Sequence, residues 1–460
     1  MNKIREEYLD RYGGVSTKAP RTIGLEVEIP VVRRDGHSIT PSDIMGLFRE
    51  IAATSQGRLV LAKDGMSLDM VRNGKVDPVA SIGTDYGSGL LEIGFPVTDS
   101  LSNAERTLRA ILNPVIATAE ANGIYLLGYG SHPATIGSKN YMMPKDRYEI
   151  LTEVFGGNNG KEGIFTMAVV SATHVHYGVR PAEFIGLTNV LNGFAPALIA
   201  LSANSAINGG QNTGLHDLHS KAWDHLIPND CGSNGSFLAQ RDLTRKGIAP
   251  IFRKIDDIWD TLIGYTPFLT KRDDRYLRFL EPRSMREHLT SGNALVADVN
   301  GNMTQIDIRP IEIKFLEGTV WWEARPRSTF GTVESRSAST QPSIAEMVAV
   351  ASVGVGFLHN LAAAEALVSR FDLNELREAR EEALTVGLDG RIGRTPIREF
   401  AAEGLKIIRR GLQAAGEDEQ YVDLLEERLT NGKNPAQRSI EIFNDGGIEG
   451  ILEAYRLRRS

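Results

Sequence analysis

The chain has 460 residues, of which 42% are hydrophobic and 24% are charged, and its formal net charge is −7. This composition is typical of a soluble globular protein with a large core, and it offers no basic field to attract nucleic acid or an anionic membrane surface. Cys231 is the only cysteine, so an intramolecular disulfide is excluded. The start, MNKIREEYLDRY, lacks an apolar signal core, and we expect a cytoplasmic protein.

Alternating apolar residues predict strands, and longer amphipathic runs predict helices, in the first two thirds of the chain. The predicted strands are 22–31, 88–95, 124–129, 164–178, 304–315, 319–325 and 331–338, and the predicted helices are 41–54, 100–122, 181–202 and 249–263. The last third is helical in pattern, over 343–369, 373–386, 396–415, 418–430 and 446–458. We therefore predict an α+β body over 1–342, with mainly antiparallel strands, and a helical portion over 343–460 packed on it.

The predicted strand at 22–31 has one unusual face. Leu25, Val27 and Ile29 share one face, because residues two apart in a strand point the same way. The other face carries Glu26 and Glu28. A solvated face is the ordinary explanation of such a pair.

The same pattern recurs in the other predicted strands, and this argues against that explanation. The residues concerned are Glu92, the pair His174 and His176, the pair Asp307 and Arg309, the pair Glu323 and Arg325, and the pair Glu334 and Arg336. Any one pair could be a cross-strand ion pair, and two histidines alone would also suit zinc. The whole set favours a hard divalent cation held by carboxylates, with arginines gripping phosphate beside it. Such a site is equipped for phosphoryl transfer from a nucleotide.

Five motifs in this order resemble the glutamate–cysteine ligase family of the second type. They are GLEVEIP, TDYGSGLLEIGFP, THVHYGV, LSANSAINGGQNTG and WWEARPRSTFGTVESRS, and they span about residues 21 to 340. The resemblance implies a catalytic fold like that of glutamine synthetase, with a curved, mainly antiparallel sheet and helices on its outer face. It also implies ATP, Mg²⁺ and phosphorylation of the γ-carboxylate of glutamate, followed by attack of an amine to form an amide.

The resemblance also implies roles for single residues. Metal ligands would be Glu26, Glu28, Asp85, Glu92, His174 and Glu334. His176, Arg325 and Arg336 would contact nucleotide phosphate or substrate, and the two arginines would be the catalytic residues.

Several alternatives stay open at this point. The amine, and whether the acid is glutamate, are not specified, and a homo-oligomer is common for soluble enzymes of this size. The same fold could host another phosphoryl transfer or a catalytically silent metal- or nucleotide-binding protein, and the two histidines alone would allow a zinc hydrolase. The stretch 216–235 either shapes the amine pocket or forms a surface loop.

Overall fold

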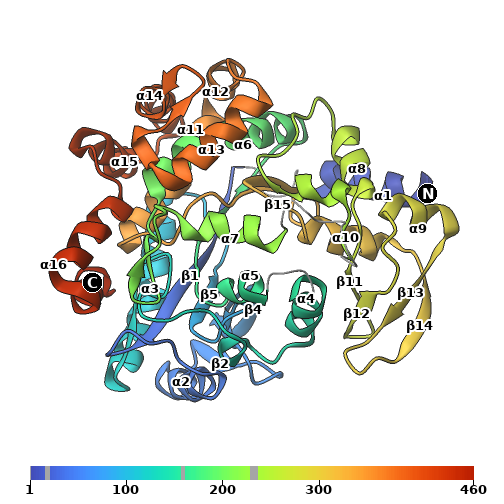
Figure 1. Ribbon diagram of the computed structural model, residues 1–460, viewed down its shortest axis with the longest axis horizontal. Coiled ribbons are helices and arrows are strands. Elements are labelled where there is room, and N and C mark those ends of the chain that lie inside the picture. Colours follow the sequence, from blue (N-terminus) through green and yellow to red (C-terminus); the bar gives the residue numbers. More distant parts are fainter. Residues whose placement is uncertain (1, 16–20, 157–160, 228–236, 460) are drawn as a thin grey trace.

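A nine-stranded antiparallel sheet forms the centre of the protein (Figure 1). A computed structural model describes residues 2–15, 21–156, 161–227 and 237–459. The strand order is β16-β17-β7-β1-β5-β4-β3-β2, and β6 pairs with the end of β1. The strands are β1 (Ile23–Arg33), β2 (Leu59–Leu61), β3 (Leu68–Arg72), β4 (Lys75–Thr84), β5 (Leu90–Gly94), β6 (Ile124–Leu126), β7 (Thr173–Gly178), β16 (Ala324–Arg327) and β17 (Thr332–Ser335).

Helices precede, connect and follow these strands. Before residue 320 they are α1 (Asn2–Val15), α2 (Pro41–Thr54), α3 (Leu101–Ala121), α4 (Asp146–Gly156), α5 (Lys161–Thr166), α6 (Phe184–Ser202), α7 (Leu218–Leu226), α8 (Ile255–Gly264), α9 (Met285–Ser291) and α10 (Pro310–Gly318). After residue 340 they are α11 (Ile344–His359), α12 (Leu361–Val368), α13 (Leu373–Thr385), α14 (Ile397–Ala415), α15 (Gln420–Asn431) and α16 (Pro435–Tyr455). The predicted α+β class with a helical last third is confirmed.

The two faces of the sheet have different neighbours. Tyr177 points from β7 to the apolar side, where its hydroxyl accepts the Gly354 N–H of α11 at 3.3 Å. Leu25, Val27 and Ile29 are fully or almost fully buried on this same side of β1. The opposite, polar face is bordered by α7, whose His219 ring lies 6.2 Å from that of His174. The alternation seen in the sequence therefore separates a helix-covered core from a polar face.

The helical last third packs closely on the apolar side. In α14, an added Cβ at Gly411 would lie 1.8 Å from the Gly356 carbonyl oxygen of α11, so the two backbones meet directly. Phe194 of α6 contacts Phe357 and Phe400, with ring centroids 4.9 and 5.5 Å away. Figure 1 shows α6 and α11–α14 gathered at one end of the molecule.

A smaller sheet lies to the side of this body (Figure 1). Its four antiparallel strands are β11 (Leu269–Arg272), β12 (Arg275–Phe279), β13 (Asn293–Ala297) and β14 (Met303–Asp307). Short paired segments complete the strands: β8 (Ile207–Asn208) with β9 (Gln211–Asn212), β10 (Lys246–Gly247) with β15 (Trp321–Trp322), and β18 (Arg391–Ile392) with β19 (Thr395–Pro396).

Two predicted strands are wrong over part of their length. The strand expected at 304–315 ends at Asp307, and Pro310 starts α10. Proline suits the first turn of a helix, and the Glu312 carboxylate caps this one by accepting the Arg309 N–H at 2.7 Å. The strand expected at 164–178 begins only at Thr173, because α5 occupies the start of that stretch.

Three predicted helices have different bounds. The helix expected at 343–369 breaks at Asn360, where α11 and α12 meet at 101°. The helix expected at 249–263 begins only at Ile255. The Asp257 carboxylate caps this start by accepting the Lys254 N–H at 3.1 Å. The helix expected at 446–458 begins earlier, as part of α16, which is kinked at Gly447 (φ 58°). Among the described helices, Pro181–Ser202 is long and apolar enough to cross a membrane, but 89% of its apolar window is buried, as in a core helix.

Candidate active site

The strand register brings the predicted polar residues onto one face. Across β16, β17 and β7, Arg325 pairs with Glu334, and Glu334 pairs with His176. On β1, Glu26 pairs with His174, and Glu28 pairs with Glu92 of β5. Residues up to about 160 positions apart in the chain, such as Glu334 and His176, therefore become direct neighbours.

Glu334 lies fully buried at the centre of three arginines. Arg325 binds it in a forked manner, with Nε 2.9 Å from Oε2 and Nη2 3.0 Å from Oε1. Arg327 Nη1 lies 3.0 Å from Oε2, and Arg336 Nη1 donates to Oε1. Burial alone would raise the pKa of Glu334, but Arg325, Arg336 and Arg327 hold that pKa well below its usual range. Glu334 is therefore an anion that orients three guanidinium groups.

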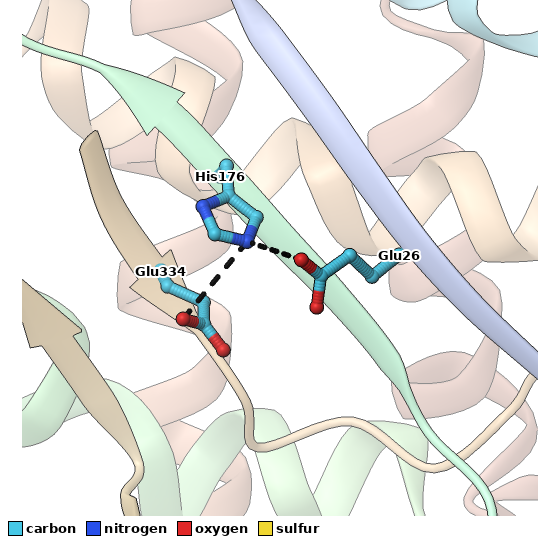
Figure 2. A group of neighbouring side chains, drawn as sticks. All are labelled: Glu26, His176 and Glu334. Atoms are coloured by element: carbon cyan, nitrogen blue, oxygen red, sulfur yellow. Dashed lines mark hydrogen bonds and ion pairs between the residues drawn. The ribbon is translucent and has the colours of Figure 1, made fainter. Parts of the chain in front are cut away.

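Glu26, His176 and Glu334 form a candidate metal centre (Figure 2). One ligand atom from each lies within 4.8 Å of the others. His176 Nε2 is 3.1 Å from Glu26 Oε1 and 3.9 Å from Glu334 Oε2. Its other ring nitrogen lies 3.0 Å from the Thr332 hydroxyl, which orients the imidazole. Burial opposes ionisation of Glu26, but the charge of His176 and hydrogen bonds from His174 and His176 hold the pKa of Glu26 well below its usual range.

Glu28 and Glu92 form a second, more acidic part of the site. Burial raises the pKa of Glu28 well above its usual value, and repulsion from Asp85 and Glu92 adds to the effect. Burial, with repulsion from Asp85 and Glu26, raises the pKa of Glu92 to about 8. A divalent cation among these oxygens would remove the repulsion, and oxygen donors suit Mg²⁺. The donor set of Glu26, Glu28 and Glu92 therefore fits this ion.

His174 lies close to two of the predicted carboxylate ligands. Its Nδ1 lies 3.8 Å from Glu26 and 3.9 Å from Glu28, and Arg336 Nη1 is 3.5 Å from the same nitrogen. Burial lowers the pKa of His174, and the charge of Arg336 lowers it further. The tight three-residue group contains His176 in its place. The metal role of His174 and the phosphate role of His176 both stay predictions.

Of the remaining predicted residues, Asp85 borders the site, and the other two pairs do not form as expected. Asp85, just after β4, accepts a hydrogen bond from the Tyr148 hydroxyl at 3.3 Å and borders the acidic part of the site. Glu323 pairs with Arg380 of α13, and not with Arg325 on the site face. Asp307 belongs to the separate four-stranded sheet, while Arg309 precedes α10, so the expectation that this pair shares the site sheet is wrong.

Some neighbours of the site were not singled out from the sequence. Arg327 stands two residues after Arg325, so strand alternation alone could have found it. Two more are Lys145, just before α4, and Arg147, within it. Their positive charges offset part of the rise in the pKa of Glu92. No sequence pattern links that segment to the sheet.

The stretch 216–235 contributes α7 to the edge of the site, and its residues from 228 onward lie outside the described chain. Trp223 lies over the Arg336 guanidinium, 5.5 Å from it, and stacks on Trp321 with ring centroids 5.0 Å apart. The described part of this stretch is therefore packed against the site and is not a solvated loop.

Comparisons with known proteins indicate the family of this chain. Residues 22–454 match the model of the glutamate-cysteine ligase family 2. A relative from Solibacter usitatus, provisionally named glutamate–cysteine ligase 2, is 21% identical over 420 residues, which are 89% of this chain and 91% of that protein. A relative of the same provisional name from Janthinobacterium sp. is 23% identical over 440 residues, 92% of each chain.

The fold is shared with a solved ligase. The crystal structure of glutamate–cysteine ligase from Francisella tularensis in complex with AMP has a TM-score of 0.56 to this chain at 13% identity, covering 95% of this chain and 88% of that one. This likeness defines the fold class, a mixed α/β ligase fold on a mainly antiparallel sheet. The family match covers nearly the whole chain, so the protein belongs to the glutamate-cysteine ligase family 2 and is a ligase that forms a C–N bond. The match also extends beyond residue 340, where the sequence motifs end.

Proposed function

We propose that this chain is an ATP-dependent carboxylate–amine ligase that joins glutamate to an amine through an acyl phosphate. The arrangement of Glu26, His176 and Glu334 beside three arginines carries the proposal. Carboxylates for a divalent cation and guanidinium groups for phosphate then lie on one sheet face, as phosphoryl transfer requires. The AMP bound to the Francisella tularensis ligase of similar fold supports nucleotide use.

The reaction has two steps in this proposal. A carboxylate oxygen of the acid attacks the γ-phosphorus, and the bond to ADP breaks with its electron pair on ADP. The amine nitrogen then attacks the acyl carbon, phosphate leaves, and the nitrogen loses one proton. Cysteine is one candidate for the amine.

Magnesium would be held by Glu26, Glu28 and Glu92, with Glu334 and a histidine beside them, and Asp85 stays a predicted further ligand. Bound there, the ion would neutralise phosphate charge as that charge shifts during transfer. The carboxylates on β1 and β5 would hold the ion, and their own positions follow from the sheet register.

The three arginines have unequal roles in this proposal. Arg325 donates through Nε and Nη2 to the Glu334 carboxylate. Its Nη1 donates to the Gly318 and Val320 carbonyls, at 3.1 and 2.6 Å. It therefore holds Glu334 in place and has little capacity left for phosphate, although the sequence predicted a phosphate or substrate contact. Arg336 has one described bond to Glu334 and faces Trp223, so we assign it to the transferred phosphoryl group. Arg327 is a second phosphate candidate, because its buried Nε has no hydrogen-bond partner among the described residues.

The helical portion over 343–460 has a supporting role in our proposal. It holds α7 against the site through Arg380, which donates to the Ser220 carbonyl at 3.0 Å. We keep the division at residue 342 and a cytoplasmic location as parts of the same proposal.

ADP release would test the proposal. The assay combines ATP, Mg²⁺, a panel of acids and a panel of amines that includes cysteine. We expect release that needs glutamate and one particular amine, and loss of release in Glu26→Gln. Glu120→Gln is the matched control, because Glu120 pairs with Arg456 on the surface. No release with any pair, together with zinc binding or with no nucleotide binding, would overturn the proposal.

A further inference from the structure

A pocket of about 710 Å³ lies at the far end of the central sheet from β16 and β17. It opens between the C-terminal end of α2, the strands β2 and β3, and α3. None of the candidate site residues is among its lining residues. It is therefore a separate feature from the active site.

Three arginines line this pocket: Arg58 at the start of β2, Arg72 at the end of β3, and Arg106 on α3. Within the described chain, none of the three has an ion-pair partner, although Arg33 and Arg109 nearby pair with Asp43 and Glu105.

The balance of charge in the pocket is positive. Among the described residues that line it, Asp77 is the only acidic one, and it already has an interaction partner. Three guanidinium groups and one carboxylate around a single hollow leave a surplus of positive charge. This surplus favours an anionic occupant, because guanidinium binds carboxylate and phosphate in forked geometry.

The rest of the wall is largely apolar. Met70, Ile111 and Pro114 line it, and Met70 belongs to the hydrophobic core. A smaller hollow of about 350 Å³ shares Arg72 and Arg106 and continues toward Thr98. The main pocket alone has a volume within the range of about 300–1,000 Å³ that small-molecule sites occupy. An occupant with both an apolar body and an anionic group would satisfy the wall and the arginines together.

We propose that this pocket binds a small amphipathic anion, with an apolar chain on Met70 and Ile111 and a carboxylate or phosphate group among the arginines. The ligand is distinct from the substrates of the proposed ligase reaction. The binding can therefore be tested independently of that reaction.

Isothermal titration calorimetry on the full chain tests the proposal with four probes. Octanoate and octyl phosphate, below their micelle concentrations, present the two anionic groups on one apolar chain. Octanol lacks the charge, and inorganic phosphate lacks the chain. We expect at least one of the two amphipathic anions to bind about tenfold or more tightly than both octanol and inorganic phosphate. The headgroup that binds more tightly identifies the ligand class.

Variants locate the binding. The double variant Arg72→Gln with Arg106→Gln should weaken anion binding about tenfold or more. Arg109→Gln is the matched control, because it lies on the same helix but pairs with Glu105 outside the pocket. Circular dichroism and thermal unfolding confirm that each variant folds. Equal binding by the double variant and the wild type, no binding of either anion, or equal binding of inorganic phosphate and octyl phosphate would overturn the proposal.

Discussion

Replacing Arg380 with methionine would leave two carboxylates, the buried Glu323 and the partly buried Asp224, without their main cation. Arg380 of α13 donates through Nε to Glu323 and through Nη1 to Asp224 Oδ2 at 2.9 Å. Its Nη2 donates to the Ser220 carbonyl of α7 at 3.0 Å. Burial alone would lower the pKa of Arg380, but Glu323 and Asp224 raise it well above its ordinary value. Methionine keeps an apolar stem and removes only the charge and the hydrogen bonds.

The expected loss of stability follows from what each carboxylate retains. Asp224 keeps Lys221 at 3.4 Å and Lys246 at 3.6 Å. Glu323, whose side chain is only 5% exposed, has no other ion-pair partner in the part of the chain that the structure describes. Removing one member of a buried pair costs roughly 3–5 kcal/mol. Because Asp224 stays paired, we expect Arg380→Met to lower the free energy of unfolding by about 3 kcal/mol, near the bottom of that range.

Urea unfolding followed by tryptophan fluorescence measures this loss. The matched control is Arg370→Met, whose ion pair with Glu403 joins side chains that are 41% and 47% exposed and should cost less than about 1 kcal/mol. Adding Glu323→Gln to Arg380→Met removes the unpaired charge and should recover part of the loss. The reasoning is refuted if Arg380→Met costs no more than the control, or if the double variant is no more stable than the single one.

Three further changes have definite expected outcomes. Arg336→Lys should lower turnover of ATP at least about a hundredfold with an unchanged unfolding midpoint, since lysine lacks the forked contact; a mild effect would remove Arg336 from phosphoryl transfer. His132, whose pKa burial lowers to about 4, must stay neutral in the fold, so stability falls as pH drops below about 6.5 while the unfolded chain takes up the proton. Its share of that loss is about 2 kcal/mol at pH 5, and urea unfolding at pH 7.5 and pH 5 should show a smaller difference in His132→Gln than in the wild type. Gly411→Ala should destabilise by about 1–3 kcal/mol in thermal or urea unfolding, because its Cβ would meet the Gly356 carbonyl, and a neutral result would contradict the close crossing of α11 and α14.

Strand alternation was enough to predict that Glu26 and Glu28 share the polar face of β1. Glu26 and Glu28 point away from Leu25 and Val27 because the side-chain period of a strand is two, and no long-range information is needed. The turn between β3 and β4 could also have been predicted from its residues. Asn73 and Gly74 both have positive φ, 52° and 73°, in the tight turn between β3 and β4, and Asn-Gly is a typical hairpin sequence.

The pairings between strands could not be predicted in the same way. Glu334 meets His176 because β17 lies beside β7, and that neighbourhood depends on the packing of the whole sheet. Glu323 shows the limit most clearly. It shares the strand pattern of Arg325, yet its ion-pair partner is Arg380, on a helix 57 residues later in the chain. Local patterns fix the direction of a side chain, while tertiary contacts decide its partner.

Charge on the polar face is ordered across the sheet. At β16 and β17, three arginines surround a single carboxylate, Glu334, so this end carries excess positive charge. At β1 and β5, Glu26, Glu28 and Glu92 leave the other end negative when they are ionised. A phosphate alone would satisfy only the first end, and a cation alone only the second. A phosphate group carrying a divalent cation would match both at once, and the proposed phosphoryl transfer would therefore account for buried like charges next to a surplus of arginine.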